Sequence, residues 1–143
     1  MSVVSKRSIR LESQDYEQSH CSTHSSLIKM LTLVSRLMPA AQLEHTLQYF
    51  GVYAETIDRL CSIVKAMPRL GDTVSGRELP VYLHYFTGVA DYYICEYDGE
   101  DTMFGKVRFK AHYPAENGYQ KFSLSNLKSN QFLELDFGWG LVQ

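Results

Sequence analysis

Histidine and cysteine side chains near the N-terminus have the types and spacing of a partial metal site. His20, Cys21 and His24 could supply two or three ligands to zinc, which prefers thiolate and imidazole. A structural zinc site needs a complete tetrahedral set, usually with a second close pair, and the sequence has no second pair at a suitable spacing. We therefore expect polar residues of an N-terminal arm here, and we predict no bound metal or other cofactor.

A cysteine and a histidine that are distant in the sequence could also meet as nucleophile and base, and the candidates are Cys61 or Cys95 with His84 or His112. Both cysteines fall on apolar positions of a helix or strand pattern, where a thiol usually behaves as a small buried hydrophobe. The sequence also contains no phosphate-binding glycine loop, nucleophile elbow or metalloprotease helix. We therefore predict no enzymatic activity. A further hypothesis is an enzyme built on His84 and a neighbouring carboxylate, which would need a concave pocket around the imidazole.

Acidic residues are concentrated in the second half of the chain. Asp98, Glu100 and Asp101 fall in a predicted turn that lacks the alternating ligand order of a calcium loop. Glu134 and Asp136 alternate in a late strand, and the same half is rich in tyrosine, which gives a large contact area at low entropy cost. An aromatic and acidic surface predicts a protein partner, in particular a basic one. The partner-binding candidates are Tyr97, Asp98, Glu100, Asp101, Glu134 and Asp136.

Basic residues alternate with apolar ones from Lys106 to Lys110, so a strand would send the three cations to one face. Beside exposed tyrosines, such a face could hold single-stranded nucleic acid, because bases stack on aromatic rings and cations follow the backbone. The simpler interpretation is that these cations exchange charges with Glu134 and Asp136 across a solvated sheet face. The nucleic-acid-binding candidates are Lys106, Arg108, Lys110 and Tyr113.

The overall composition restricts the class of protein. The 14 Lys and Arg residues against 16 Asp and Glu give a formal charge of -2, which disfavours a dedicated duplex-DNA binder. No apolar stretch approaches the roughly 20 residues that cross a bilayer, and the charged start is not followed by the apolar segment of a secretory signal. The cysteines are an odd number, widely spaced, without a secretion signal. We therefore expect a cytoplasmic protein with free thiols and no membrane contact.

The element pattern changes twice along the chain. Residues 1–24 are rich in polar residues without a sustained period and predict a flexible arm. Helical spacing of apolar residues predicts helices over 25–38, 40–50 and 57–67, ended by Pro39, Gly51 and Pro68. Aromatic and β-branched segments then predict five antiparallel strands, with a tight turn at Asp98-Gly99 and one helical turn at 125–128. The predicted strands are Val81–Phe86, Tyr92–Tyr97, Met103–Lys110, Tyr119–Leu124 and Phe132–Phe137.

Neither half of the chain can bury its apolar side alone. Three short helices need a surface to cover, and an aromatic sheet needs a cover. We therefore expect a single α+β domain over residues 25–143, in which the helical part 25–67 packs on one face of the sheet part 81–139.

Six segments of the sheet part carry a family resemblance: Val81–Phe86, Asp91–Asp101, Phe104-Gly105, Gly118-Tyr119, Phe122–Leu124 and Leu133–Phe137. They resemble small uncharacterised domains carried by conjugative plasmids and phages. The resemblance implies an accessory protein of a mobile element that acts in the host cytoplasm and binds a host or defence-system protein. The leading hypothesis is thus a non-enzymatic counter-defence inhibitor, of the anti-CRISPR or antirestriction type, whose acidic residues cover a nucleic-acid channel. The alternative is a single-stranded nucleic-acid-binding protein.

Overall fold

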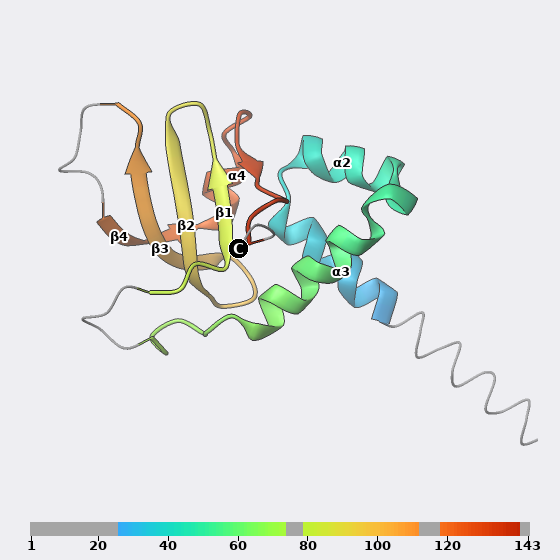
Figure 1. Ribbon diagram of the computed structural model, residues 1–143, viewed down its shortest axis with the longest axis horizontal. Helices are drawn as coiled ribbons and strands as arrows, with labels where there is room; N and C mark the ends of the chain where they lie inside the picture. The colour runs from blue at the N-terminus through green and yellow to red at the C-terminus, as the bar shows by residue number, and fades with distance from the viewer. Residues whose placement is uncertain (1–25, 74–78, 112–117, 141–143) are drawn as a thin grey trace, which may run out of the picture. The chain divides into compact units, whose positions relative to one another are not determined.

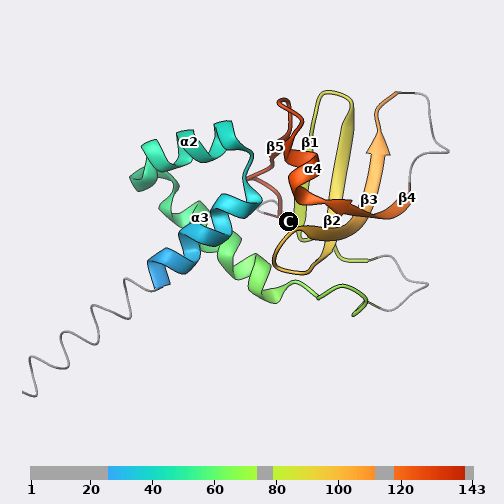
Figure 2. The ribbon, with the colours of Figure 1, turned by 180° about the vertical axis from the view of Figure 1, so that it is seen from behind.

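The computed structural model describes residues 26–73, 79–111 and 118–140 (Figure 1). The described elements are a helix over residues 26–37, α2 (Ala40–Gln48), α3 (Phe50–Ala66), β1 (Leu83–Phe86), β2 (Ala90–Tyr97), β3 (Thr102–Phe109), β4 (Gly118–Ser123), α4 (Leu124–Lys128) and β5 (Glu134–Leu135). The strands form an antiparallel sheet in the order β4-β3-β2-β1-β5, so that β4 and β5 are its two edges (Figures 1 and 2). The predicted α+β class, with helices preceding a five-stranded antiparallel sheet, is confirmed.

The chain divides into two compact units, Met1–Thr32 and Leu33–Gln143. In the first unit, residues 26–32 are helical, and the Thr32 hydroxyl donates a 2.8 Å hydrogen bond to the carbonyl oxygen of Ile28. The predicted arm over residues 1–24 lies outside the described residues. The surfaces discussed below all belong to the second unit.

Prolines delimit the helices of the second unit, as the sequence predicts. Pro39 directly precedes α2, and α3 ends just before Met67, which is extended with φ -65° and ψ 138°. The residue before a proline is disfavoured in helical conformation because the proline ring would clash with it, and Pro68 imposes this limit on Met67.

The predicted end of a helix at Gly51 is wrong. The helix α2 already ends at Gln48, because Tyr49 has φ -113° and ψ 45°, and α3 starts at Phe50 and continues through Gly51. Gly51 does not have a positive φ, so its conformational freedom is not used for a helix cap. The third helix is therefore longer than the predicted range, which began at residue 57.

One face of the sheet is buried and forms the core with the helices of the second unit. The buried residues alternate along β1 and β3, and Tyr85 on β1 is completely buried. The Tyr85 hydroxyl donates a 2.6 Å hydrogen bond to the carbonyl oxygen of Leu37, in the last turn of the helix over residues 26–37. This bond satisfies a carbonyl that a helix end leaves without an intrahelical partner. The main core side chains are Val34, Leu37, Met38, Ile57, Leu60, Leu83, Tyr85, Ile94, Met103, Val107, Leu124 and Leu135.

We expect Tyr85→Phe to destabilise the protein by about 1–3 kcal/mol, because the carbonyl of Leu37 would stay buried without its donor. Chemical denaturation of the full chain measures the change. Tyr49→Phe is the matched control, because Tyr49 is 47% exposed, and its loss of a hydroxyl should leave the unfolding midpoint unchanged. Equal midpoints for the two variants would contradict the prediction.

The edge strand β5 is paired on its outer side by a side chain. The Gln42 amide nitrogen donates to the carbonyl oxygen of Leu135 at 2.9 Å, and the Leu135 N–H donates to the Gln42 amide oxygen at 2.7 Å. Strand β5 is shorter than the predicted Phe132–Phe137, because the N–H of Leu133 is held in a turn by the carbonyl oxygen of Asn130. The amide of Gln42 thus substitutes for a neighbouring strand.

Candidate functional site

The acidic turn between β2 and β3 is organised by its own carboxylates. Oδ1 of Asp98 accepts hydrogen bonds from the backbone N–H groups of Glu100, Asp101 and Thr102 at 2.8, 3.0 and 3.1 Å. Burial by itself would raise the pKa of Asp98, but the backbone donors outweigh it, and the pKa is lowered. Gly99 in the same turn has φ +87°, the left-handed conformation that glycine accepts at low cost.

Asp101 joins this turn to the start of α4. Its carboxylate accepts from the Ser123 hydroxyl at 2.7 Å and from the Ser125 N–H at 2.7 Å, and these bonds, first that of Ser123, lower its pKa. Asp98 and Asp101 are thus both engaged in holding local structure.

Tyr97 cannot contact a partner as the sequence predicted. It is only 2% exposed, and its hydroxyl donates to the carbonyl oxygen of Glu100 at 2.9 Å. Burial, as the largest cause, raises the pKa of Tyr97 to about 12. The prediction that Tyr97 belongs to an exposed binding surface is wrong.

The six candidate partner-binding residues do not form one surface. Glu134 on β5 lies opposite Phe86, at the end of the sheet where Asp91 pairs with Phe86, whereas the acidic turn follows Tyr97 at the other end of β2. Asp91 and Tyr97 are separated by six residues of strand, which is roughly 20 Å. The acidic side chains therefore lie at two ends of the sheet, and the expectation of a continuous acidic surface is not met.

The face of the sheet opposite the core carries a different group of residues, which we call the open face. Strand alternation and pairing place on it His84, Phe86, Asp91, Tyr93, Phe104, Lys106, Arg108, Tyr119 and Lys121. Of these, Lys106, Arg108, Tyr119 and Lys121 are exposed. The open face thus combines aromatic rings with cations.

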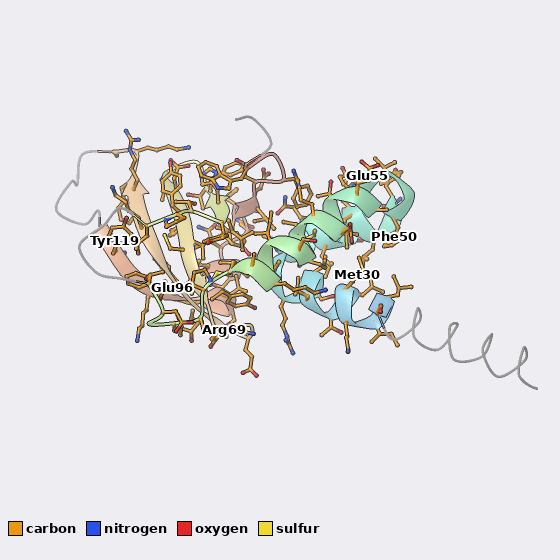
Figure 3. All side chains as sticks on the ribbon, turned by 60° about the horizontal axis from the view of Figure 1, so that its bottom comes forward. Met30, Phe50, Glu55, Arg69, Glu96 and Tyr119 are labelled. Carbon is orange, nitrogen blue, oxygen red and sulfur yellow. The ribbon has the colours of Figure 1, made fainter. Side chains whose placement is uncertain are left out.

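Cations and tyrosines alternate across the strands of the open face. Lys106 pairs with Tyr93 on one side and with Tyr119 on the other, so the lysine stands between two aromatic rings. The Tyr119 ring is 44% exposed and stacks with Phe104 at a centroid distance of 5.8 Å and an interplanar angle of 16°. Figure 3 labels Tyr119 on the edge strand β4. Sequence reasoning missed Lys121, because only the pairing of β4 with β3 places it opposite Phe104.

The simpler sequence interpretation, charge exchange between the basic strand and Glu134 with Asp136, is wrong. Two strands, β2 and β1, separate β3 from β5. Among the described residues, the ion pairs within 4.0 Å are the two made by His84, and neither involves Lys106 or Arg108. Both cations therefore remain available to a ligand.

The remaining nucleic-acid-binding candidates differ from Lys106 and Arg108. Lys110 lies beyond the end of β3, and its ammonium donates to the carbonyl oxygen of Thr87 at 3.3 Å. Tyr113 lies outside the described residues.

His84 is held between two carboxylates at the β1 side of the open face. Its Nδ1 lies 2.9 Å from Oδ2 of Asp136, and its Nε2 lies 2.9 Å from Oδ1 of Asp91. The imidazole stacks on Tyr93 with ring centroids 4.9 Å apart and planes at 10°, and Trp139 packs on it at 5.1 Å. Both ring nitrogens of His84 are thus engaged by carboxylates, and an enzyme built on this residue stays a hypothesis.

Glu96 limits the open face at its other end. The carboxylate accepts from the N–H groups of Gly71 and Thr73 at 2.9 and 3.0 Å and from the Thr73 hydroxyl. These bonds tie residues 71–73 to β2, the strand that carries Glu96 (Figure 3). Burial would raise the pKa of Glu96, but the bonds from Thr73 and Gly71 outweigh it, so that the pKa is lowered.

A carboxyl group whose pKa is lower in the folded than in the unfolded protein stabilises the fold above its unfolded pKa, and this stabilisation is lost as the pH falls. We therefore expect unfolding at lower denaturant concentration below about pH 4.5, near the ordinary Glu value. Glu96→Gln should destabilise the protein by about 1–3 kcal/mol at neutral pH, because the amide NH2 of glutamine would face a backbone N–H, which is also a donor. The difference in stability between the wild type and this variant should become smaller in acid. Glu44→Gln is the control, because Glu44 is exposed. If Glu96→Gln were as stable as this control at neutral pH, the stabilising role of the Glu96 carboxylate would be refuted.

The cysteines proposed as nucleophiles are buried in the structure. Cys61 and Cys95 are buried free thiols, and burial raises the pKa of both, that of Cys95 to about 11. No group of three potential metal ligands occurs among residues 26–73, 79–111 and 118–140, while His20, Cys21, His24 and His112 lie outside these ranges. Within the same ranges, every helix is too short or too polar to cross a membrane.

Comparisons with protein-family models, with curated proteins and with solved structures found no match for this chain. The resemblance to domains of conjugative plasmids and phages therefore stays a prediction.

Proposed function

We propose that this chain is a non-enzymatic binding protein that holds single-stranded nucleic acid on the open face of its sheet. The observation that carries the proposal is the alternation of exposed cations with aromatic rings, with Lys106 between Tyr93 and Tyr119. Aromatic rings accept stacked bases, at about 1–3 kcal/mol per base, and cations beside them follow the sugar–phosphate backbone.

The charge of the chain favours a single strand over a duplex. A formal charge of -2 provides no long-range basic field, and the cations of the open face are few. A single strand compensates for weak electrostatic attraction, because its unpaired bases can stack on Tyr119 and its neighbours. Proteins with such a platform bind with little sequence preference.

The experiment that tests the proposal is a fluorescence-anisotropy titration of labelled single-stranded DNA and RNA with the full chain at several salt concentrations. We expect affinity to fall as salt rises, and Tyr119→Ala to weaken binding by about tenfold, the equivalent of one lost stacking contact. Phe132→Ala is the matched control, because Phe132 is 69% exposed but lies outside the open face. Absent or salt-independent binding would overturn the proposal.

A second candidate function is binding to a protein, and exposed apolar residues at the junction of α2 and α3 favour it. Leu47, Tyr49, Phe50 and Val52 lie within six residues of sequence and are all exposed, Val52 by 76%. Figure 3 labels Phe50 at this junction. Apolar residues grouped on a surface are typical of protein–protein contacts. A host or defence-system protein as partner, in the host cytoplasm, rests on the resemblance to mobile-element domains alone.

We expect Val52→Asp to abolish capture of such a partner from nuclease-treated host lysate, because a charge would be buried in the contact. The variant Ser62→Asp adds the same charge at another exposed position of α3 and should leave capture unchanged. Quantitative mass spectrometry of the captured proteins compares the three forms. Loss of all capture on nuclease treatment would instead favour the nucleic-acid proposal.

A further inference from the structure

We infer that residues 136–139 form a pH-dependent latch, closed by the positively charged form of His84, that controls access to the Tyr93 side of the open face. The latch is defined by Asp136, Phe137, Gly138 and Trp139, and its closed position is the one in the structure. The latch itself follows from the contacts of these residues, whereas its effect on nucleic acid rests on the proposed function.

The number of protons on the His84 ring determines which hydrogen bonds the ring can donate. A neutral imidazole carries one N–H and can donate to one acceptor, whereas an imidazolium carries two. Both ring nitrogens of His84 lie 2.9 Å from a carboxylate oxygen, one of Asp136 and one of Asp91. Only the charged ring can donate to both carboxylates, and a neutral ring would set a nitrogen lone pair against one of them.

Asp136 fixes the position of Trp139 through hydrogen bonds within the latch. Oδ2 of Asp136 faces His84, while its Oδ1 accepts from the Gly138 N–H at 2.9 Å, and its carbonyl oxygen accepts from the Trp139 N–H at 3.3 Å. Asp136 is therefore the residue through which His84 acts on the latch. The indole Nε1 makes the other hydrogen bond, to the carbonyl oxygen of Val81 at 3.3 Å.

The start of the latch is held independently of His84's side chain. The Asp136 N–H donates to the carbonyl oxygen of His84 at 2.8 Å, and a guanidinium nitrogen of Arg59 donates to the carbonyl oxygen of Phe137. Tyr53 packs edge-on against the Phe137 ring at 6.0 Å. Loss of the imidazolium should therefore release Trp139 while the beginning of the segment stays in place.

Within the part of the chain that the structure describes, the titratable groups in contact with the His84 ring are carboxylates and a tyrosine. The groups on β2 are Asp91 and Tyr93, and Asp136 follows β5. At a greater distance from His84 are three charged residues on neighbouring strands. In the strand register, Glu134 lies opposite Phe86, Lys106 opposite Tyr93 and Arg108 opposite Asp91. Of these residue types, only histidine ordinarily titrates between about pH 5 and pH 8. A rise in pH through this range removes one donor and should open the latch.

Opening has a defined consequence for the open face. The Trp139 ring packs on Tyr93 at a centroid distance of 5.6 Å as well as on His84. Tyr93 pairs with Lys106, so the release of Trp139 would add a stacking position beside a cation. The protein should then hold a longer stretch of single strand at higher pH.

The latch can be measured without any ligand, because Trp139 is the one tryptophan in the sequence. Tryptophan fluorescence and its quenching by acrylamide are recorded on the full chain from about pH 5 to about pH 9, the range that spans histidine titration. We expect the emission to shift to longer wavelength and quenching to increase as the pH rises. His84→Gln cannot be charged and should give emission that is independent of pH across the range.

A second variant keeps the test decisive if His84→Gln does not fold. Asp136→Asn retains the shape but weakens the bond to His84, and its emission should stay at long wavelength even at low pH. Circular dichroism confirms the fold of each form. A wild-type emission independent of pH, or a pH-dependent shift that persists in His84→Gln, would overturn the latch.

The effect of the latch on nucleic-acid binding is measured in a separate titration with single-stranded oligonucleotides. Trp139→Ala should bind single strands at low pH as tightly as the wild type does at high pH, because no indole ring packs on its Tyr93 at either pH. If no form binds an oligonucleotide, the proposed function fails while the fluorescence result still decides the latch. If the wild type binds but Trp139→Ala shows the same pH dependence, control of access by Trp139 is overturned.

Discussion

Gly105→Ala is expected to destabilise the protein by more than about 4 kcal/mol, which is most of the stability of a domain at the lower end of the ordinary range. A Cβ atom at Gly105 would lie 2.0 Å from the carbonyl oxygen of Tyr93 and 2.9 Å from Cα of Ile94. These neighbours are backbone atoms of the paired strand β2, so no side-chain rotation can relieve the contact. The pairing of β2 with β3 also becomes irregular directly after Ile94, between it and Glu96.

Chemical denaturation followed by circular dichroism measures this effect. The matched control is Gly88→Ala in the turn between β1 and β2, where an added Cβ meets nothing within 4 Å and φ is not positive. This control should change stability by less than about 1 kcal/mol, and in the stabilising direction if alanine restricts the unfolded chain. A folded Gly105→Ala protein with the unfolding midpoint of Gly88→Ala would show that the close approach of the two strands is wrong.

The double substitution Lys106→Ala and Arg108→Ala should have the largest effect on binding. Both side chains are exposed and unpaired within the described part of the chain, so their removal costs no internal ion pair. If each contacts one phosphate, the slope of log K against log salt should become shallower by about 1.4, since each phosphate of a single strand contributes about 0.7. We expect affinity for single strands to fall about tenfold or more at low salt.

The control for this experiment changes the same kind of charge elsewhere. Lys65→Ala removes an exposed cation from the last turn of α3, and it should leave the salt slope unchanged. If Lys65→Ala reduced affinity as much for each removed charge as the double variant does, the proposed function would be wrong. Binding would then depend on the net charge of the protein and not on the cations of the open face.

Local features of the fold could be predicted because they depend on neighbouring residues. Proline limits its predecessor, and α3 accordingly ends before Met67 and Pro68. The acidic turn needs a residue with positive φ, and Gly99 supplies it. The helix end predicted at Gly51 was wrong because glycine occurs both after helices and within them. The sequence does not distinguish the two cases when the residues that follow the glycine are also compatible with a helix.

The site depended on strand pairing, which the sequence does not encode locally. His84 meets Asp136 across 52 residues of chain, and nothing near either residue indicates the other. The acidic residues were predicted to form one surface because composition carries no information on where each residue lies along a strand. In the structure they lie near opposite ends of β2. Lys106 and Arg108 were found because alternation within one strand is a local property, whereas the cation partner of Phe104 on β4 was missed.

The amide of Gln42 also determines how this sheet could assemble. Because a side chain occupies the outer hydrogen-bonding groups of Leu135, a foreign strand finds no vacancy beyond β5, and extension is confined to the β4 side. A subunit that can add a strand at one sheet edge alone cannot form a head-to-tail fibre by strand addition, because such a fibre needs two free edges in each subunit. Two copies that joined there would meet through identical strands, and the result would be a closed, two-fold symmetric pair.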